Sequence, residues 1–133
     1  MVGAGGIVAY RLAVPAANPA PTGPGYARGV ATADLSVLAL GRPDVSASEY
    51  IAEIQRRLQR QGRVRYRMHA MGTSLEGPTE DILAIVCELH AVPFEQGVPR
   101  VYTILKLDER RDRPGQTLDE KIRSVEDRLG GDI

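Results

Sequence analysis

The sequence predicts an α+β domain in which helices pack against a four-stranded antiparallel sheet. Apolar residues alternate with polar ones in four segments, and apolar residues recur at helical spacing in three others. The two kinds of segment follow each other in the order β-α-β-β-α-β-α. With two right-handed crossovers, this order gives a ferredoxin-like βαββαβ sandwich with an additional C-terminal helix.

Residues 1–29 are predicted to form an arm outside this domain, which spans residues 30–133. The arm contains the stretch "PAANPAPTGPG", and a segment so rich in Ala, Pro and Gly buries too little apolar surface to offset its ordering entropy. We expect it to be disordered, or to come from a start codon assigned too far upstream. A signal peptide is the less favoured interpretation, because no positive charge precedes the apolar part and Arg11 interrupts it.

The first strand is predicted over residues 31–40, where apolar and polar side chains alternate. The first helix is predicted to begin at Ser46, because Ser46 and Glu49 have the spacing of a capping box. Gly62 is expected to end it through a left-handed turn. Its buried stripe is expected to contain Ile51, Ile54 and Leu58.

A hairpin and a second helix follow. Residues 64–71 and 73–76 alternate on either side of Gly72, which predicts two short antiparallel strands. The second helix is predicted to begin near Thr79, and residues 91–99 are predicted to be a loop. The buried side of this helix is expected to contain Ile82, Ile85, Val86 and Leu89.

The last two elements are a strand over residues 100–108 and a C-terminal helix. Thr117 and Glu120 have the capping-box spacing, and Gly130 is expected to end the helix. The apolar stripe of this helix contains Leu118, Ile122, Val125 and Leu129.

The topology places the helices on one sheet face and leaves the second face uncovered. This face mixes charged with bulky apolar side chains, and it can either be solvated or dock a second subunit with a ligand at the seam. Its expected members are Ser36, Arg65, Arg67, His69, Tyr102, Ile104 and Lys106.

Composition excludes several classes of function. Lys and Arg number 17, as do Asp and Glu, so no net charge attracts nucleic acid or an anionic membrane. The single cysteine, Cys87, allows no internal disulfide, and His69 and His90 lack the spacing of metal ligands. We find no phosphate-binding loop and no catalytic constellation, so the sequence predicts neither an enzyme nor a metal or cofactor site.

The hairpin carries the best candidate for a small-molecule site. Thr73, Ser74 and Glu76 lie between Gly72 and Gly77, which allow a close backbone approach. Their polar groups can simply satisfy the local backbone. Alternatively, a hydroxyl and a carboxylate can bind an amino-bearing heterocycle, since a charged acceptor strengthens the hydrogen bond, and Tyr102 can supply a stacking face.

Several segments in order carry a family resemblance: "ASEYIAEIQRRLQRQG", "YRMHAMGTSLEG", "PRVYTILKLDERRD" and "TLDEKIRSVEDRL". Together, over about residues 31–129, the chain resembles the thiamine-binding protein family. The resemblance implies a cytoplasmic, non-catalytic protein that binds thiamine (vitamin B1) or its hydroxymethylpyrimidine part near a subunit contact. It implies a homodimer or homotetramer, with no nucleic-acid or membrane partner and no cofactor.

The resemblance also implies ligand-binding positions. In this numbering they are Met71, Gly72, Thr73, Glu76, Tyr102, Thr103 and Lys106. Glu76 would accept hydrogen bonds from the pyrimidine amine, Thr73 would orient the ring and Tyr102 would flank it. Two other functions stay open: an acylphosphatase-like hydrolase, for which Arg42 would have to bind a phosphate, and a purely structural assembly module.

Overall fold

The computed structural model describes residues 29–44, 46–113 and 115–130. Their elements form a four-stranded sheet in the order β2-β3-β1-β4, with every pair of neighbours antiparallel. This arrangement confirms the predicted fold class. Except for Gly29, the predicted N-terminal arm lies outside the described residues. The elements are β1 (Ala31–Leu40), α1 (Ala47–Gln59), β2 (Arg65–His69), β3 (Gly72–Gly77), α2 (Thr79–Glu95), β4 (Arg100–Glu109) and α3 (Leu118–Leu129).

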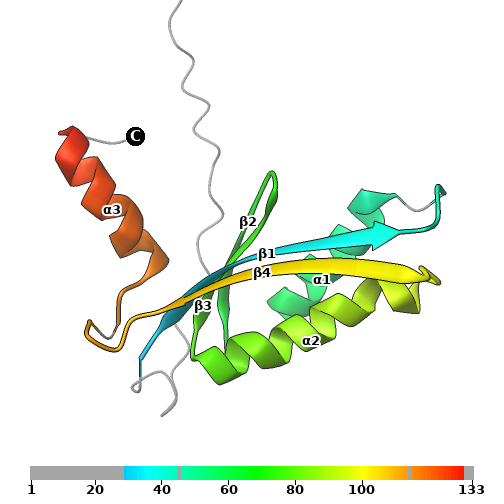
Figure 1. Cartoon of the computed structure of the whole chain (residues 1–133), viewed down its shortest axis with the longest axis horizontal. Helices are drawn as coiled ribbons and strands as arrows, with labels where there is room; N and C mark the ends of the chain where they lie inside the picture. Colours follow the sequence, from blue (N-terminus) through cyan, green and yellow to red (C-terminus); the bar gives the residue numbers. More distant parts are fainter. Residues whose placement is uncertain (1–28, 45, 114, 131–133) are drawn as a thin grey trace, which may run out of the picture.

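The hydrophobic core lies between the sheet and two helices, α1 and α2 (Figure 1). Each strand sends alternate side chains into it, and the residues in between form the open face of the sheet. The strand register places Asp34 beside Lys106, Ser36 beside Ile104 and Leu38 beside Tyr102 on that open face. The largest fully buried core side chains are Leu58, Val64, Leu75, Ile82, Ile85, Leu89, Val92 and Pro93.

The two ladders of β1 differ in length, and this difference positions the candidate site. Pairing with β4 continues to Leu40, which lies opposite Arg100. Pairing with β3 ends where Leu35 lies opposite Thr73. Within the described sheet, residues 36–40 therefore have a strand neighbour on one side and a space on the other, bounded by α1 and the β2–β3 turn.

Helix α1 differs from its prediction at both ends. Ser46 is the N-cap residue, but its hydroxyl bonds Ser48 Oγ at 2.7 Å and caps no backbone amide. The helix ends at Gln59 with Arg60 in a right-handed conformation, and Gly62 has no positive φ. Its buried side contains Tyr50 in place of Ile51, because α1 is rotated so that Ile51 faces the space beside β1.

Helix α2 is longer than its prediction. It continues through the expected loop to Glu95 and includes Pro93. Proline removes a backbone hydrogen bond from a helix interior. Val92 and Pro93 are both buried, so the apolar surface that they bury offsets this cost.

Helix α3 confirms its predicted caps but not its predicted place. Thr117 and Glu120 form the capping box, and Gly130 ends the helix with φ of 78°. However, α3 stands at one end of the sheet, away from α1 and α2, and none of its residues is buried (Figure 1). Its first turn instead contacts open-face side chains, since Leu118 N donates to Glu76 Oε1 at 2.8 Å. The helices therefore do not all cover one face.

Candidate functional site

A groove of about 430 Å³ lies beside the unpaired half of β1. We call it the hairpin groove, because its third wall is the turn between β2 and β3. Its lining is mainly apolar, with a few polar groups, as is typical of sites for small organic molecules. It is lined by residues 35–38 of β1, by Ala47, Tyr50, Ile51, Ile54 and Gln55 of α1, and by residues 68–73 of the hairpin.

Hydrogen bonds from β1 hold the hairpin turn in place. Ser36 Oγ donates to the Met71 carbonyl at 3.2 Å, and His69 Nε2 lies 2.8 Å from Asp34 Oδ1. The Met71 amide donates to His69 Nδ1 at 3.3 Å, so Nδ1 is the unprotonated nitrogen and Nε2 the donor to Asp34. Met71 itself is 83% exposed at the tip. The turn therefore presents a thioether at the rim of the groove on a fixed backbone.

Gly72 is required at this turn by space rather than by its backbone angles. A Cβ on Gly72 would lie 2.6 Å from the Leu35 carbonyl oxygen and 3.2 Å from Ser36 Oγ. Only a residue without a side chain lets β3 approach β1 this closely. The close approach in turn brings the next residue, Thr73, into the wall of the groove.

Gln55 and Thr73 form a polar pair in the groove wall. Gln55 Nε2 donates to Thr73 Oγ1 at 3.0 Å across the space between α1 and β3. The carbonyl oxygen of the Gln55 amide has no hydrogen-bond partner among the described residues. A primary amide offers a donor and an acceptor side by side, and the same pair binds an amine next to a ring nitrogen.

Glu76 lies on the opposite face of β3 from Thr73 and is 2% exposed. Its Oε2 accepts from Arg65 Nη1 at 2.9 Å, and its Oε1 accepts from Leu118 N at 2.8 Å. A carboxylate at a helix N-terminus is favoured by the helix dipole. In this arrangement Glu76 anchors α3 to the sheet and does not line the hairpin groove.

The other predicted positions are dispersed. Tyr102 lies on the open face and is 53% exposed, next to Leu38 on β1. Thr103 Oγ1 lies 2.7 Å from His90 Nδ1 on α2, on the covered face. Lys106 lines a separate cavity of about 260 Å³ under α3. Of the predicted ligand-binding positions, the structure brings together Met71, Gly72 and Thr73.

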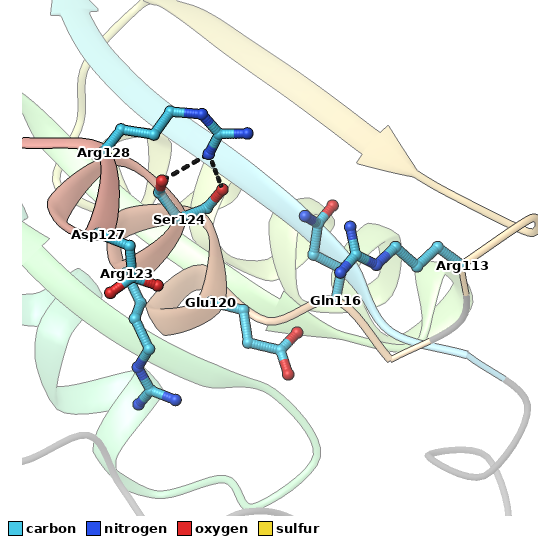
Figure 2. A pocket seen from close by; sticks show the side chains of 7 residues that line it. All are labelled: Arg113, Gln116, Glu120, Arg123, Ser124, Asp127 and Arg128. Atoms are coloured by element: carbon cyan, nitrogen blue, oxygen red, sulfur yellow. Dashed lines mark hydrogen bonds between the residues drawn. The ribbon is translucent and has the colours of Figure 1, made fainter.

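A third cavity, of about 280 Å³, lies between α3 and the connection that precedes it. Its side chains are strongly charged but do not converge on one point. Figure 2 shows Arg123 and Arg128 extended away from each other. Arg128 Nη1 donates to the carbonyl oxygen and to Oγ of Ser124, at 2.6 and 2.8 Å. The cavity therefore offers no assembled charge for a ligand.

Arg42, the residue that a phosphatase would use, is already engaged. Its guanidinium bonds Asp44 Oδ2 at 2.7 Å and donates to the carbonyls of Gln96 and Gly97. The Asp44 hydrogen bond raises the pKa of Arg42, and the same bond lowers the pKa of Asp44. Arg42 therefore links the segment after β1 to the end of α2. Among the described residues, no three His, Cys, Asp or Glu side chains are grouped to hold a metal ion.

Sequence reasoning missed the α1 wall of the groove. Gln55 directly follows Ile54, which was expected to be buried, and Tyr50 belongs to no recognisable motif. Neither residue was therefore a candidate for the site. The available signal was the polar Gln55 adjacent to an apolar stripe, which is weak alone. Tyr50 is buried, and its hydroxyl accepts from the Ala39 amide at 3.4 Å beyond the end of the β3 ladder.

The fold and groove define a small α+β domain of ferredoxin-like topology with a mainly apolar groove beside the unpaired half of β1. None of the described helices combines the length and apolar character needed to cross a bilayer. The model of the thiamine-binding protein family matches residues 33–126. The chain therefore belongs to the thiamine-binding protein family.

Related chains match about three quarters of this chain. The UPF0045 protein YqgV of Bacillus subtilis is 36% identical over 103 residues, which are 75% of this chain and 98% of the relative. The UPF0045 protein in the glkA 3' region of Staphylococcus xylosus is 37% identical over 100 residues, covering 73% and 92% of the two chains.

Solved structures share the fold. A hypothetical protein from Methanocaldococcus jannaschii is 30% identical, with a TM-score of 0.63 over 72% of this chain and 95% of its own. A Thermotoga maritima protein with a provisional thiamine biosynthesis/salvage name is 26% identical. Its TM-score is 0.60, covering 72% of this chain and 98% of its own.

Proposed function

We propose that the protein is a non-catalytic, oligomeric cytoplasmic binding protein for thiamine or its hydroxymethylpyrimidine part, and that the ligand occupies the hairpin groove. The observation that carries the proposal is the Gln55–Thr73 pair at 3.0 Å in the wall of an apolar groove of about 430 Å³. Membership of the thiamine-binding protein family and the name of the Thermotoga maritima neighbour support the class of ligand.

The groove matches an aminopyrimidine in its pattern of hydrogen-bonding groups. The ring carries an amine beside a ring nitrogen, and the Gln55 amide presents the complementary acceptor and donor. Thr73 orients that amide, and the side chains of Ile51 and Ile54 supply an apolar wall for the ring. Met71 at the rim is a flexible, polarizable cover for it.

The positive thiazolium ring of thiamine needs a negative neighbour, which the groove wall does not itself contain. Asp34 is an acid that a hydrogen bond connects to the groove, since its Oδ1 lies 2.8 Å from Nε2 of His69, which lines the groove. We therefore place the pyrimidine inside the groove and the thiazolium towards the open face. Glu76, Tyr102, Thr103 and Lys106 lie outside the groove, and the proposal assigns them no contact with the pyrimidine in this arrangement.

Titration calorimetry with hydroxymethylpyrimidine, thiamine and thiamine phosphates tests the proposal. Gln55→Leu keeps the size of the side chain and removes both amide groups, so we expect it to weaken pyrimidine binding by about 10- to 100-fold. Gln59→Leu, the same change one turn later on α1 and outside the groove lining, is the matched control. Unchanged affinity in Gln55→Leu would exclude the groove as the site.

Glu76→Gln separates the two possible acceptors for the pyrimidine amine. If Gln55 binds the ring, this variant retains its affinity, because Glu76 lies outside the groove lining. Loss of binding in Glu76→Gln with full binding in Gln55→Leu would move the site to the open face. Absence of binding by the wild-type chain would refute the proposed function as a whole.

A further inference from the structure

We infer that the binding site extends from the hairpin groove onto the open face of the sheet, where Lys106 binds the phosphate of a thiamine phosphate ester. The inference rests on the proposed function, because it takes the pyrimidine to lie in the groove. It adds the class of ligand that the protein prefers, which is a phosphate ester rather than free thiamine. The phosphate would occupy the cavity of about 260 Å³ where α3 attaches to the sheet, which we call the Lys106 cavity (Figure 1).

The hairpin groove and the Lys106 cavity adjoin each other on the open face. Ser36 lines the groove, and Asp34, two residues before it on the same face of β1, lines the cavity. Two strand residues span about 7 Å. His69 belongs to the groove lining, and its Nε2 lies 2.8 Å from Asp34 Oδ1, so a hydrogen bond joins the two linings. A ligand that fills the groove can therefore extend past Asp34 into the cavity.

The cavity presents an acid and a base on neighbouring strands. Asp34 of β1 lies directly opposite Lys106 of β4 in the antiparallel register. Side chains that are opposite each other in such a ladder have Cβ atoms about 5 Å apart. In the sheet order, β1 lies between the hairpin and β4. A ligand leaving the groove therefore meets the negative charge of Asp34 first and the positive charge of Lys106 second.

The Lys106 ammonium is available for a ligand, whereas the other lysine of the cavity is not. Lys121 Nζ donates to Thr32 Oγ1 at 2.7 Å and forms an ion pair with Asp108. By contrast, Lys106 Nζ has neither an ion pair nor a hydrogen bond among the described residues. Ser74 Oγ, which also lines the cavity, has no hydrogen-bond partner in the described part of the chain. An ammonium and a hydroxyl can both donate to phosphate oxygens.

A phosphate ester of thiamine carries its charges in the matching order. Its neutral aminopyrimidine is followed by the positive thiazolium ring and then by the negative phosphate on the hydroxyethyl arm. With the pyrimidine beside Gln55, the thiazolium meets Asp34 and the phosphate meets Lys106. Free thiamine is a cation without an anionic group, so it leaves the charge of Lys106 uncompensated. Complementary charges give specificity, and this arrangement therefore favours the phosphate ester.

Titration calorimetry of the full chain with thiamine, thiamine monophosphate and hydroxymethylpyrimidine tests the inference. The measured quantity is the ratio of the affinities for the monophosphate and for thiamine, because contacts in the groove are common to both ligands. We expect the wild type to bind the monophosphate about 10-fold more tightly. This is the lower end for a charged hydrogen bond, since Lys106 is exposed. The preference should fall as the salt concentration is raised.

Two substitutions of Lys106 and one matched control isolate its charge. Lys106→Met keeps the length of the side chain and removes the ammonium, so the ratio should fall to about one. Lys106→Arg keeps the charge and should retain a preference for the monophosphate. Arg100→Met removes a positive charge at the other end of β4, outside both linings, and should leave the ratio unchanged. The affinity of each variant for hydroxymethylpyrimidine reports whether the groove is intact.

The outcomes separate this inference from the proposed function. Equal affinities of the wild type for thiamine and thiamine monophosphate would overturn the inference and leave the proposed function standing. A preference that survives Lys106→Met would overturn the assignment of Lys106. Inorganic phosphate that binds as tightly as thiamine monophosphate would show an anion site unconnected to the groove, which also overturns the inference. A wild type that binds none of the three organic ligands would refute the proposed function together with the inference.

Discussion

Replacing Glu76 by alanine is expected to destabilise the domain substantially, because this carboxylate joins three elements. It is 2% exposed and links Arg65 on β2 with the first amide of α3. Removing one member of a buried ion pair costs about 3–5 kcal/mol. Arg65 is partly exposed, with 20% of its side-chain surface accessible, so the lower end of that range applies.

We therefore expect Glu76→Ala to lower the free energy of unfolding by about 3 kcal/mol. For a domain of this size, that loss corresponds to a fall in Tm of about 12–15 °C. Glu76→Gln keeps an oxygen acceptor for Leu118 N but loses the charge, and should cost about 1–2 kcal/mol. Urea unfolding followed by circular dichroism measures both values. Asp127→Ala removes an exposed acid on α3 and should change stability by less than about 0.5 kcal/mol.

A double-mutant cycle with Arg65→Met isolates the ion pair, and its coupling energy should be about 1–2 kcal/mol. The reasoning fails if Glu76→Ala lowers the unfolding free energy by less than about 1 kcal/mol. Such a result would mean that the carboxylate is not a structural anchor, and would favour the ligand-binding role that the motif implied for it.

Two further outcomes follow from single contacts. Gly72→Ala should lower the free energy of unfolding by about 1–3 kcal/mol, because the added Cβ overlaps the Leu35 carbonyl oxygen of β1. Gly62→Ala is the control, since no atom lies within 4 Å of its Cβ. In the same urea assay it should be neutral or stabilising. The Thr79 hydroxyl, donating at 2.6 Å, and then Arg111 lower the pKa of Glu109. The stability from this bond is present above the usual carboxyl pKa and is lost as pH falls through the lowered one. Thr79→Val should raise the pKa of Glu109 in a carbon-detected NMR titration and reduce stability at neutral pH but not at strongly acidic pH; an unchanged pKa would contradict this.

The element order could be read from the sequence because it depends on local periodicity. Apolar residues have a period of two in residues 31–40 and 100–108, and helical spacing in segments between them. These periods indicate which side of each element is apolar. The same local reasoning located the Thr117–Glu120 capping box and the left-handed Gly130, because both depend on neighbouring residues in the chain. The hairpin candidates Met71, Gly72 and Thr73 came from one continuous motif, and the structure places them in one groove.

Features that depend on packing between distant segments were missed. The rotation of α1 that buries Tyr50 and turns Ile51 and Gln55 to the groove is set by contacts with the sheet. Pro93 lies within α2 because the apolar surface that it buries offsets the lost hydrogen bond. Local helix propensity does not predict this position for a proline.

The sequence by itself determined the order of strands and helices, the pairing of the hairpin and the family to which the chain belongs, because these depend on local pattern and motif. Only the tertiary structure decided that β3 pairs with half of β1, that Glu76 receives the amino end of α3, and that Gln55 meets Thr73. Periodicity shows which face of an element is apolar, but the surface that covers it depends on residues far along the chain. The groove and the exposed stripe of α3 both arise from that second kind of information.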